Sequence, residues 1–295
     1  PWRTLRKFFL FNMASILVLK RRINAAQNVS KTTKAMQMIA ASKMKRAQEA
    51  TLASRPYVDR LTMLSSKLSK QKTDKSVHPY LENRKFSGKT LVIVISPDKG
   101  LCGGLITNLL REFLQYNKID ENVTFVTVGK KLEMQVARRQ KEVIASFVFG
   151  NTTPNLDMVY PVTRIIEEYY TLGKVDSVKI IGTHFTSIFS QTPKITTILP
   201  LQVEEEKTAE QTSHLFEPNI EELLSPLLNH YLEMAVYQHF LESFVSEQAA
   251  RMIAMQNATD NANGIVEDLK LEYNKTRQAK IISPSKIWQK RLKKL

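Results

Sequence analysis

The segment SPDKGLCGGLITNLL (96–110) is where phosphate-binding chemistry would first be expected. It follows an apolar run, contains Gly100, Gly103 and Gly104, and leads into a helical pattern. Free backbone N–H groups at such a turn can bind a phosphate. The glycine spacing, three residues and then one, does not match the dinucleotide motif G-x-G-x-x-G. We therefore expect these glycines to let a helix pack tightly on its strand.

A second candidate phosphate loop is the triplet Gly88-Lys89-Thr90, which resembles the end of a Walker A motif. The motif requires a glycine five positions before Gly88, where this chain has Asn83. The triplet also precedes an apolar strand pattern instead of following one. No phosphate loop is expected, and no cofactor is predicted.

Metal-binding and nucleophilic side chains are scattered along the chain. No two histidines have H-x-x-x-H spacing, so we expect packing or surface histidines and no metal site. Cys102 is the only cysteine, which excludes an intrachain disulfide and a thiol-rich metal site. No catalytic constellation is recognisable, and the chain is predicted not to be an enzyme on its own. The histidines are His78, His184, His214, His230 and His239.

Charge is distributed unevenly along the 295 residues, whose formal net charge is +15. Eleven Lys or Arg residues precede Glu49, the first carboxylate. This imbalance favours an acidic partner, which could be nucleic acid, a membrane surface or an acidic protein socket. No run of 18 apolar residues is present, so no segment is predicted to span a membrane.

Residues 16–70 have the pattern of one long helix. Apolar or small residues recur with steps of 3, 3, 4, 3, 4, 4 and 3, close to the 3.5-residue repeat of a coiled-coil seam. Pro56 is expected to mark a kink. At about 1.5 Å per residue, the helix would be about 80 Å long and must project from a domain of this size. The predicted seam is Ile23, Ala26, Val29, Thr33, Met36, Ala40, Met44 and Ala47.

Residues 219–282 have a similar pattern with heptad-compatible spacing. Two such seams at opposite ends of one chain favour an antiparallel intrachain pair over an extended homodimeric coiled coil, which would more often use Leu at alternate seam positions. The predicted seam residues are Leu227, Tyr231, Met234, Leu241, Val245 and Met252.

Between the two helices, apolar β-rich runs alternate with helical patterns. This alternation is typical of a doubly wound α/β fold. The fold class predicted is therefore α/β, with a small doubly wound α/β domain inserted between long N- and C-terminal helices that form an antiparallel coiled coil. We expect strands at 90–96, 122–128, 142–149, 175–185 and 194–201, and helices at about 104–116, 130–140 and 156–172.

The expected divisions follow these patterns. The opening twelve residues are basic and weakly resemble a presequence, but we expect an upstream extension of a protein whose mature part begins near Met13. The divisions are the upstream extension (1–12), an N-terminal coiled-coil helix (13–70), a Rossmann-like α/β domain (71–215), a C-terminal coiled-coil helix (216–282) and an atypical basic tail (283–295).

Four blocks of the sequence resemble the γ subunits of F-type ATP synthases. The resemblance runs from about Ser15 to Ile281, and the first and last blocks are long and specific. The blocks are RRINAAQNVSKTTKAMQMIAASKMKRAQ (21–48), SPDKGLCGGLITNL (96–109), LFEP (215–218) and SEQAARMIAMQNATDNANGIVEDLKLEYNKTRQAKI (246–281).

The resemblance implies a rotor shaft that turns inside a hexamer of α and β subunits and couples proton flow through a membrane c-ring to ATP synthesis. It implies that Arg251, Arg277 and Gln278 engage the catch loops of the β subunits. Lys34 and Met36 would face the β levers. Phe216 and Glu217 would contact the membrane ring, and the α/β domain would dock the ε subunit.

The resemblance also implies a location beside a membrane. Because the matching region begins close to Met13, we favour the cytoplasmic face of a bacterial plasma membrane over the matrix side of a mitochondrial inner membrane. The redox switch of chloroplast relatives is not expected, since it needs two cysteines.

The tail ISPSKIWQKRLKKL (282–295) departs from the family, which usually has an apolar helical end here. Pro284 is expected to break the helix. Either the upper bearing is altered, or the tail arises from a frameshift or assembly fault, which we favour.

Two other functions are weighed against the shaft. A basic coiled-coil protein that binds nucleic acid would fit the charge, but residues 20–50 contain no aromatic side chain to stack on bases. A dinucleotide-dependent enzyme built on the α/β domain would need a different glycine spacing.

Overall fold

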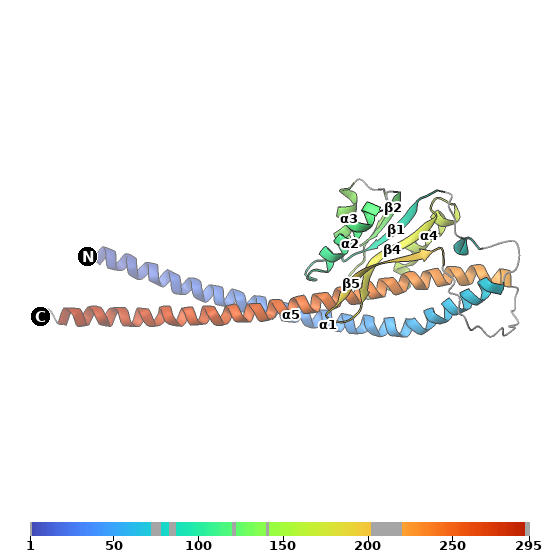
Figure 1. Cartoon of the computed structure of the whole chain (residues 1–295). Helices are drawn as coiled ribbons and strands as arrows, with labels where there is room; N and C mark the ends of the chain where they lie inside the picture. Colours follow the sequence, from blue (N-terminus) through green and yellow to red (C-terminus); the bar gives the residue numbers. More distant parts are fainter. Residues whose placement is uncertain are drawn as a thin grey trace. The chain divides into compact units, whose positions relative to one another are not determined.

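A computed structural model describes residues 2–71, 78–82, 87–119, 122–139, 142–201 and 220–292 of the chain. In chain order, one long helix precedes and another follows a sheet of five strands and its shorter helices, as the colours of Figure 1 show. The elements are α1 (Trp2–Gln71), η1 (Pro79–Leu81), β1 (Thr90–Ile95), α2 (Leu105–Ile119), β2 (Val123–Val128), α3 (Lys130–Ala137), β3 (Val143–Phe147), η2 (Leu156–Met158), α4 (Tyr160–Thr171), β4 (Ser177–Phe185), β5 (Gln191–Leu199) and α5 (Ile220–Leu292).

The contacts divide the chain into two compact units, which are described separately. The helix-pair unit consists of Pro1–Ile39 and Ala254–Leu295, the outer parts of the two long helices. The sheet unit is Ala40–Ile253, which includes the inner parts of both helices.

The sheet unit is built on a sheet with the strand order β3-β2-β1-β4-β5. The first four strands run parallel, with Ile93 of β1 opposite Val126 of β2 and Ile180 of β4. β5 is antiparallel to β4, because only residues 186–190 connect them and a parallel crossover needs a dozen residues or more. The five expected strands and the doubly wound α/β fold are confirmed, with an antiparallel strand at one edge.

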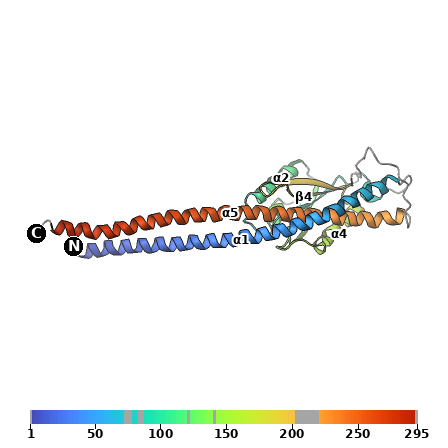
Figure 2. The ribbon, with the colours of Figure 1, turned by 90° about the horizontal axis from the view of Figure 1, so that it is seen from below.

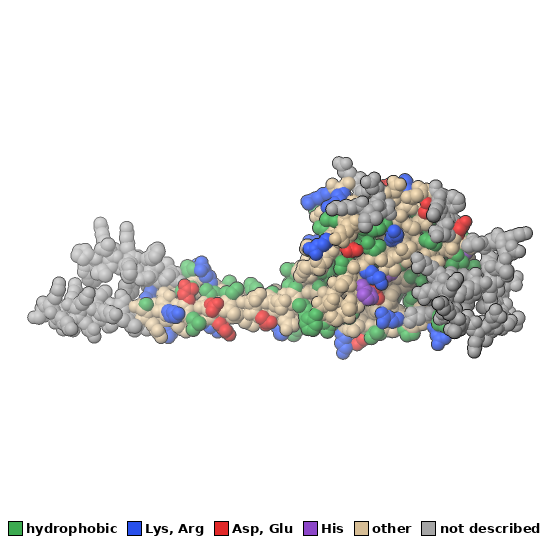
Figure 3. Space-filling model, in the orientation of Figure 1, with side chains coloured by type: hydrophobic (Ala, Val, Ile, Leu, Met, Phe, Trp, Pro, Cys, Tyr) green, Lys and Arg blue, Asp and Glu red, His purple; other side chains and the backbone are tan. Residues whose placement is uncertain are grey.

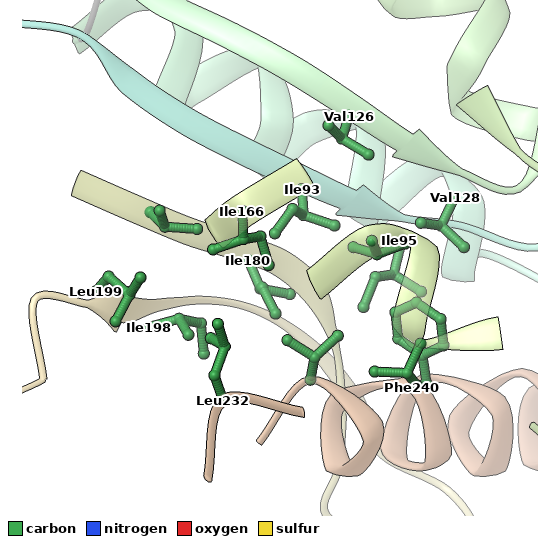
Figure 4. Close-up of a cluster of buried hydrophobic side chains, with 14 of the residues drawn as sticks. Ile93, Ile95, Val126, Val128, Ile166, Ile180, Ile198, Leu199, Leu232 and Phe240 are labelled. Carbon is green, nitrogen blue, oxygen red and sulfur yellow. The ribbon is translucent and has the colours of Figure 1, made fainter. Parts of the chain in front are cut away.

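Both faces of the sheet are covered, so every residue of β1 and β2 is buried. On one face, Val92, Val94 and Phe125 pack against Leu109 and Phe113 of α2 and against α3. The opposite face packs on α4 and the inner part of α5, together with Met44 and Ala47 of α1. In Figure 4, residues from four strands lie with Leu232 and Phe240 in this second cluster.

The inner part of α5 lies very close to β4. A Cβ at Gly182 would be 3.0 Å from the Ser243 hydroxyl oxygen. That hydroxyl accepts from the backbone N–H of Thr183 at 3.4 Å, and the Ser246 hydroxyl donates to the Thr183 carbonyl at 3.3 Å. Small and hydroxyl-bearing residues therefore let the helix pack on the strand backbone.

The glycines of segment 96–110 have a different role from the one expected. A Cβ at Gly100 would meet nothing within 4 Å, and one at Gly104 would meet only the Asn108 amide nitrogen, at 3.9 Å. Gly103 has a φ of 57°, which glycine adopts readily. The expectation of tight helix packing was wrong here. The glycines form a turn, and close approaches occur at Gly129 and Gly182 instead.

In the helix-pair unit, α1 and α5 lie side by side and run antiparallel (Figure 2). Among the described residues of this unit, three side-chain hydrogen bonds join the two helices. Their residue numbers rise along α1 as they fall along α5, as expected of an antiparallel pair. Ser30 donates to Asn263 at 2.7 Å, the hydroxyls of Thr33 and Thr259 are 2.7 Å apart, and Gln37 donates to Gln256 at 3.5 Å. The predicted intrachain antiparallel pair is confirmed.

The register of the seam on α1 differs from the prediction at two positions. Val29 and Met36 are 53% and 40% exposed, and the adjacent Ser30 and Gln37 face α5 instead. The corrected seam has steps of 4, 3, 4, 3 and 4, a regular heptad pattern. The prediction missed Ser30 and Gln37 because it favoured apolar or small residues, whereas these two polar side chains hydrogen-bond across the pair. Its positions are Leu19, Ile23, Ala26, Ser30, Thr33 and Gln37.

The corrected register predicts unequal effects of two similar truncations. Ile23 is 9% exposed, so Ile23→Ala should lower the free energy of unfolding by about 2 kcal/mol. Val29→Ala, at an exposed site, should change it by less than about 0.5 kcal/mol. Urea unfolding of the full chain, followed by far-UV circular dichroism, measures both. A larger loss for Val29→Ala would restore the original register.

The ends of the long helices also differ from expectation. α5 continues to Leu292, so the prediction that Pro284 would break it was wrong. A proline removes one backbone hydrogen bond, and a helix held by the bonds on either side can pass it. α1 likewise continues through Pro56 and begins at Trp2. Within the described residues, no helix has the length and apolar character needed to span a membrane.

Candidate partner-binding surfaces

Two histidines of the described residues lie in pairs with carboxylates. His184 lies 2.9 Å from the Glu242 carboxylate, and His230 contacts both the Tyr57 hydroxyl at 2.8 Å and Glu233 at 3.3 Å. No group of three potential metal ligands occurs in the described part of the chain. Cys102 is buried, and burial raises the pKa of its thiol. These groups make contacts within the fold, so binding residues are expected on the surface.

Four of the candidate contact residues lie in the helix-pair unit, and all four are exposed. Lys34 and Met36 lie on α1, where the Lys34 ammonium group donates to Gln37 at 3.2 Å. Arg277 and Gln278 lie on α5. The register of the pair places Arg277 level with residue 16, about 27 Å along the axis from Lys34. The four exposed candidate residues therefore lie at two separate levels along the helix pair.

Helix α1 of this pair has a run of exposed basic side chains. Each can form an ion pair with an acidic partner, and such contacts exchange readily in water because an exposed pair contributes only about 0–1 kcal/mol. The acidic side chains Asp260, Glu267 and Asp268 are exposed on α5. Acidic and basic side chains are interspersed on the face shown in Figure 3, unlike the single basic face expected of a nucleic-acid binder. The exposed basic residues are Lys20, Arg21, Arg22, Lys31 and Lys34.

Arg251, the fifth candidate, belongs to the sheet unit and is largely buried. Its side chain is 14% exposed and lies 2.6 Å from the carboxylate of Glu247, one turn earlier on α5. A second guanidinium nitrogen donates to the backbone carbonyls of Lys99 and Gly100 at 3.4 and 3.3 Å. Arg251 therefore fastens the glycine-rich loop to α5 and presents little surface to a partner.

Glu247 is the most buried charged side chain in this group, at 3% exposure. One of its oxygens pairs with Arg251 and also accepts from the Gln248 amide at 3.4 Å, whereas the other is buried without a hydrogen-bond partner. Burial raises the pKa of the Glu247 carboxyl, and the Arg251 charge opposes that rise. The pair is thus a buried clamp between α5 and the loop.

The remaining two candidates, Phe216 and Glu217, lie outside the described residues. Two features were not found by sequence reasoning. The first is the set of polar seam pairs between Ser30 and Asn263 and between Gln37 and Gln256, which a strict heptad count from Leu19 would have located. The second is the Arg251 clamp, for which the Glu-x-x-x-Arg spacing on one helix was the available signal.

The chain has the features of a stalk-type interaction protein. Its long terminal helices pair through a hydrogen-bonded seam, expose polar residues and enclose a small α/β sheet in the sequence. The family model described as ATP synthase matches residues 15–283. The ATP synthase gamma chain of Dehalococcoides mccartyi is 38% identical over 273 residues, covering 91% of this chain and 95% of that protein. That of Leptothrix cholodnii is 38% identical over 281 residues, with the same coverages.

Solved structures show the same arrangement. The central stalk and c-ring of the Tetrahymena thermophila mitochondrial ATP synthase includes a chain 26% identical to this one, with a TM-score of 0.57 and coverages of 77% of this chain and 99% of that chain. A rotor chain of the Euglena gracilis mitochondrial enzyme, 18% identical, has the same fold with a TM-score of 0.62, covering 91% and 99%.

The chain therefore belongs to the ATP synthase gamma chain family. It is a non-catalytic subunit of the central stalk of ATP synthase, and the nucleic-acid and dinucleotide-enzyme alternatives are not supported.

Proposed function

We propose that the helix pair is a shaft that turns within a hexamer of ATP synthase α and β subunits. Rotation driven by proton flow through the membrane c-ring would carry the asymmetric shaft past each β subunit in turn and cycle its site through binding, synthesis and release. The observation that carries this proposal is the antiparallel pair, hydrogen-bonded along its seam and with exposed polar residues outside. A coiled pair of this kind is stiff enough to transmit torque.

Two levels of the pair are proposed to contact the β subunits. Arg277 and Gln278 would bind the catch loops, because a guanidinium and an amide can both donate to carboxylates. Lys34 and Met36 would contact the levers, with one charged and one apolar side chain exposed on the same turn. Their axial separation allows the two levels to act on different parts of a β subunit.

Arg251 is proposed to act on the β subunits through the loop that it holds. Its guanidinium is already committed to Glu247 and to two loop carbonyls. A direct salt bridge to a catch loop would require those contacts to break. Positioning of segment 96–104 is therefore the role that its geometry favours.

Partners outside the hexamer are proposed from the family. The sheet unit would dock the ε subunit, and Phe216 and Glu217 would contact the c-ring. The chain would then associate peripherally with a membrane through the ring. We favour the cytoplasmic face of a bacterial plasma membrane, since the relatives quoted at 38% identity are bacterial; the matrix side of a mitochondrial inner membrane is the alternative.

The catch contact is tested by co-expressing the chain with ATP synthase α and β subunits and measuring the ATPase activity of the purified complex. The double variant Arg277→Ala/Gln278→Ala should lower activity about tenfold, equivalent to about 1.4 kcal/mol of barrier. Lys275→Ala removes an exposed charge from the same helix and is the matched control, expected to stay within about twofold.

Two outcomes would contradict the proposal in different ways. If the wild-type chain forms no complex with the α and β subunits, the shaft function is wrong. If the complex forms and the double variant behaves like Lys275→Ala, the assignment of the catch residues is wrong.

A further inference from the structure

The tip of the β4–β5 hairpin, residues 186–190, presents an aromatic side chain to solvent. Phe189 is 84% exposed, and its neighbour Ile188 is 37% exposed. An aromatic ring on a surface is a common anchor in protein interfaces, where Phe and other large apolar groups supply most of the binding free energy. Phe189 therefore buries little of its apolar surface within the chain.

The tip holds this side chain on a rigid turn. The backbone N–H of Ser190 donates to the Ser187 carbonyl at 3.2 Å, and the N–H of Ser187 donates back to the Ser190 carbonyl at 3.0 Å. The Gln191 amide donates to the carbonyls of Ser187 and Ile188 at 3.0 and 2.7 Å. Since the turn is already ordered, it loses little conformational entropy when a partner binds Phe189.

A hollow of about 220 Å³ adjoins the tip, because Phe185 and Thr186 line it just before the turn begins. Its other walls include Leu52 and Arg55 of α1 and Glu242 of α5. Small-molecule sites usually measure about 300–1,000 Å³. The hollow is smaller than this range, and its size suits one or two side chains of a protein partner.

The charge around the hollow favours an acidic partner. The hairpin from 177 to 201 contains no Asp or Glu. The one carboxylate on the wall, Glu242, is paired with His184 at 2.9 Å. Arg55 is exposed beside the hollow and can pair with a carboxylate from outside.

The position of the tip connects it with the proposed hexamer contacts. β1 and β4 are parallel neighbours, with Val94 opposite Ile181, so their carboxyl ends lie at the same edge of the sheet. The loop after β1, which Arg251 holds, and the hairpin tip therefore share this edge. Leu101, in that loop, and Val148, just after β3, are also exposed there, at 63% and 59%.

We propose that the hairpin tip and the adjoining hollow form a docking site for an acidic segment of the α/β hexamer. An apolar side chain of that segment packs on Phe189, and a carboxylate binds Arg55. The docking site rests on the proposed function, since it assumes that the hexamer is the partner.

The test measures the dissociation constant between the full-length chain and a purified hexamer of α and β subunits. Phe189→Ser should weaken binding at least about tenfold. Arg55→Gln should weaken it about threefold and reduce its dependence on salt. The matched controls are Leu172→Ser, an apolar site 63% exposed at the opposite edge of the sheet, and Arg111→Gln, an exposed arginine on α2. Both controls should bind like wild type.

Folding is checked by the urea midpoint of each variant, which should not change because both side chains are exposed. If wild type does not bind the hexamer, the proposed function fails and the docking site fails with it. If wild type binds and Phe189→Ser matches Leu172→Ser, the docking site alone is wrong. Weaker binding to the ε subunit with unchanged binding to the hexamer would also overturn it.

Discussion

Arg251→Ala should lower the free energy of unfolding of the sheet unit by about 3–5 kcal/mol, because it leaves the buried Glu247 carboxylate without its counter-charge. The loss includes the hydrogen bonds from the guanidinium to the carbonyls of Lys99 and Gly100. Urea unfolding of the full chain measures the change. Arg164→Ala, which removes an exposed arginine from α4, should cost less than about 0.5 kcal/mol.

A second variant separates loss of the pair from loss of a single partner. Replacing both residues, as in Glu247→Gln/Arg251→Met, removes the buried charges together and should recover most of the stability. If Arg251→Ala costs no more than Arg164→Ala, Arg251 does not hold the loop.

The pH dependence of the free energy of unfolding is a second test of the Glu247–Arg251 pair. Burial raises the folded-state pKa of Glu247 above its unfolded value, so the folded state holds the proton more tightly. Its stabilising contribution is present below the unfolded pKa and is lost as the pH rises through the folded pKa. Arg251 lowers the pKa of Glu247, so Arg251→Ala should steepen this loss and extend it to higher pH.

Gly129→Ala should destabilise the sheet unit by at least about 3 kcal/mol. Gly129 joins β2 to α3 with a φ of 96°, and an added Cβ would lie 1.8 Å from the Ser96 carbonyl oxygen. The clash is with backbone at the end of β1, so no side-chain rotation relieves it. The free energy of unfolding in urea, followed by circular dichroism, checks this prediction.

Gly150→Ala is the matched control for the backbone conformation. Gly150 has a φ of 81°, but an added Cβ would meet nothing within 4 Å. It should therefore cost only the conformational strain, about 1–2 kcal/mol. Equal costs for the two variants would mean that the contact with Ser96 contributes nothing.

The sheet could be predicted from sequence because its strands are buried on both faces. Uninterrupted apolar runs such as 90–95 have no other stable arrangement in a small α/β unit. The doubly wound fold class followed from the alternation of strands and helices, whereas the strand order was not predicted. The antiparallel direction of β5 was available from the short link at 186–190, but an apolar pattern alone carries no direction.

The errors arose where polar groups are buried or apolar groups exposed. Val29 and Met36 were assigned to the seam for their apolar side chains, whereas Ser30 and Gln37 occupy it by pairing with polar residues of α5. Such pairing depends on the partner helix, which lies more than two hundred residues away in sequence. Phe189 lies between the predicted strands 175–185 and 194–201, and its exposure depends on the geometry of the hairpin turn.

The candidate contact residues came from the family resemblance, and the geometry divides them. Arg277, Gln278, Lys34 and Met36 are exposed and can reach a partner. Arg251 looks similar in sequence, but tertiary contacts with the loop commit its guanidinium. Residue type and helical position alone could not separate these two roles.

The shaft function is tested most directly by single-molecule rotation. The chain, with Cys102→Ser and Met134→Cys to give one exposed attachment point, is assembled with α and β subunits fixed to a surface, and a bead is attached at position 134. With ATP, we predict continuous rotation of the bead in one direction, and Arg277→Ala/Gln278→Ala should slow it. A stable, ATP-hydrolysing complex whose bead shows only Brownian fluctuation would rule out the shaft function.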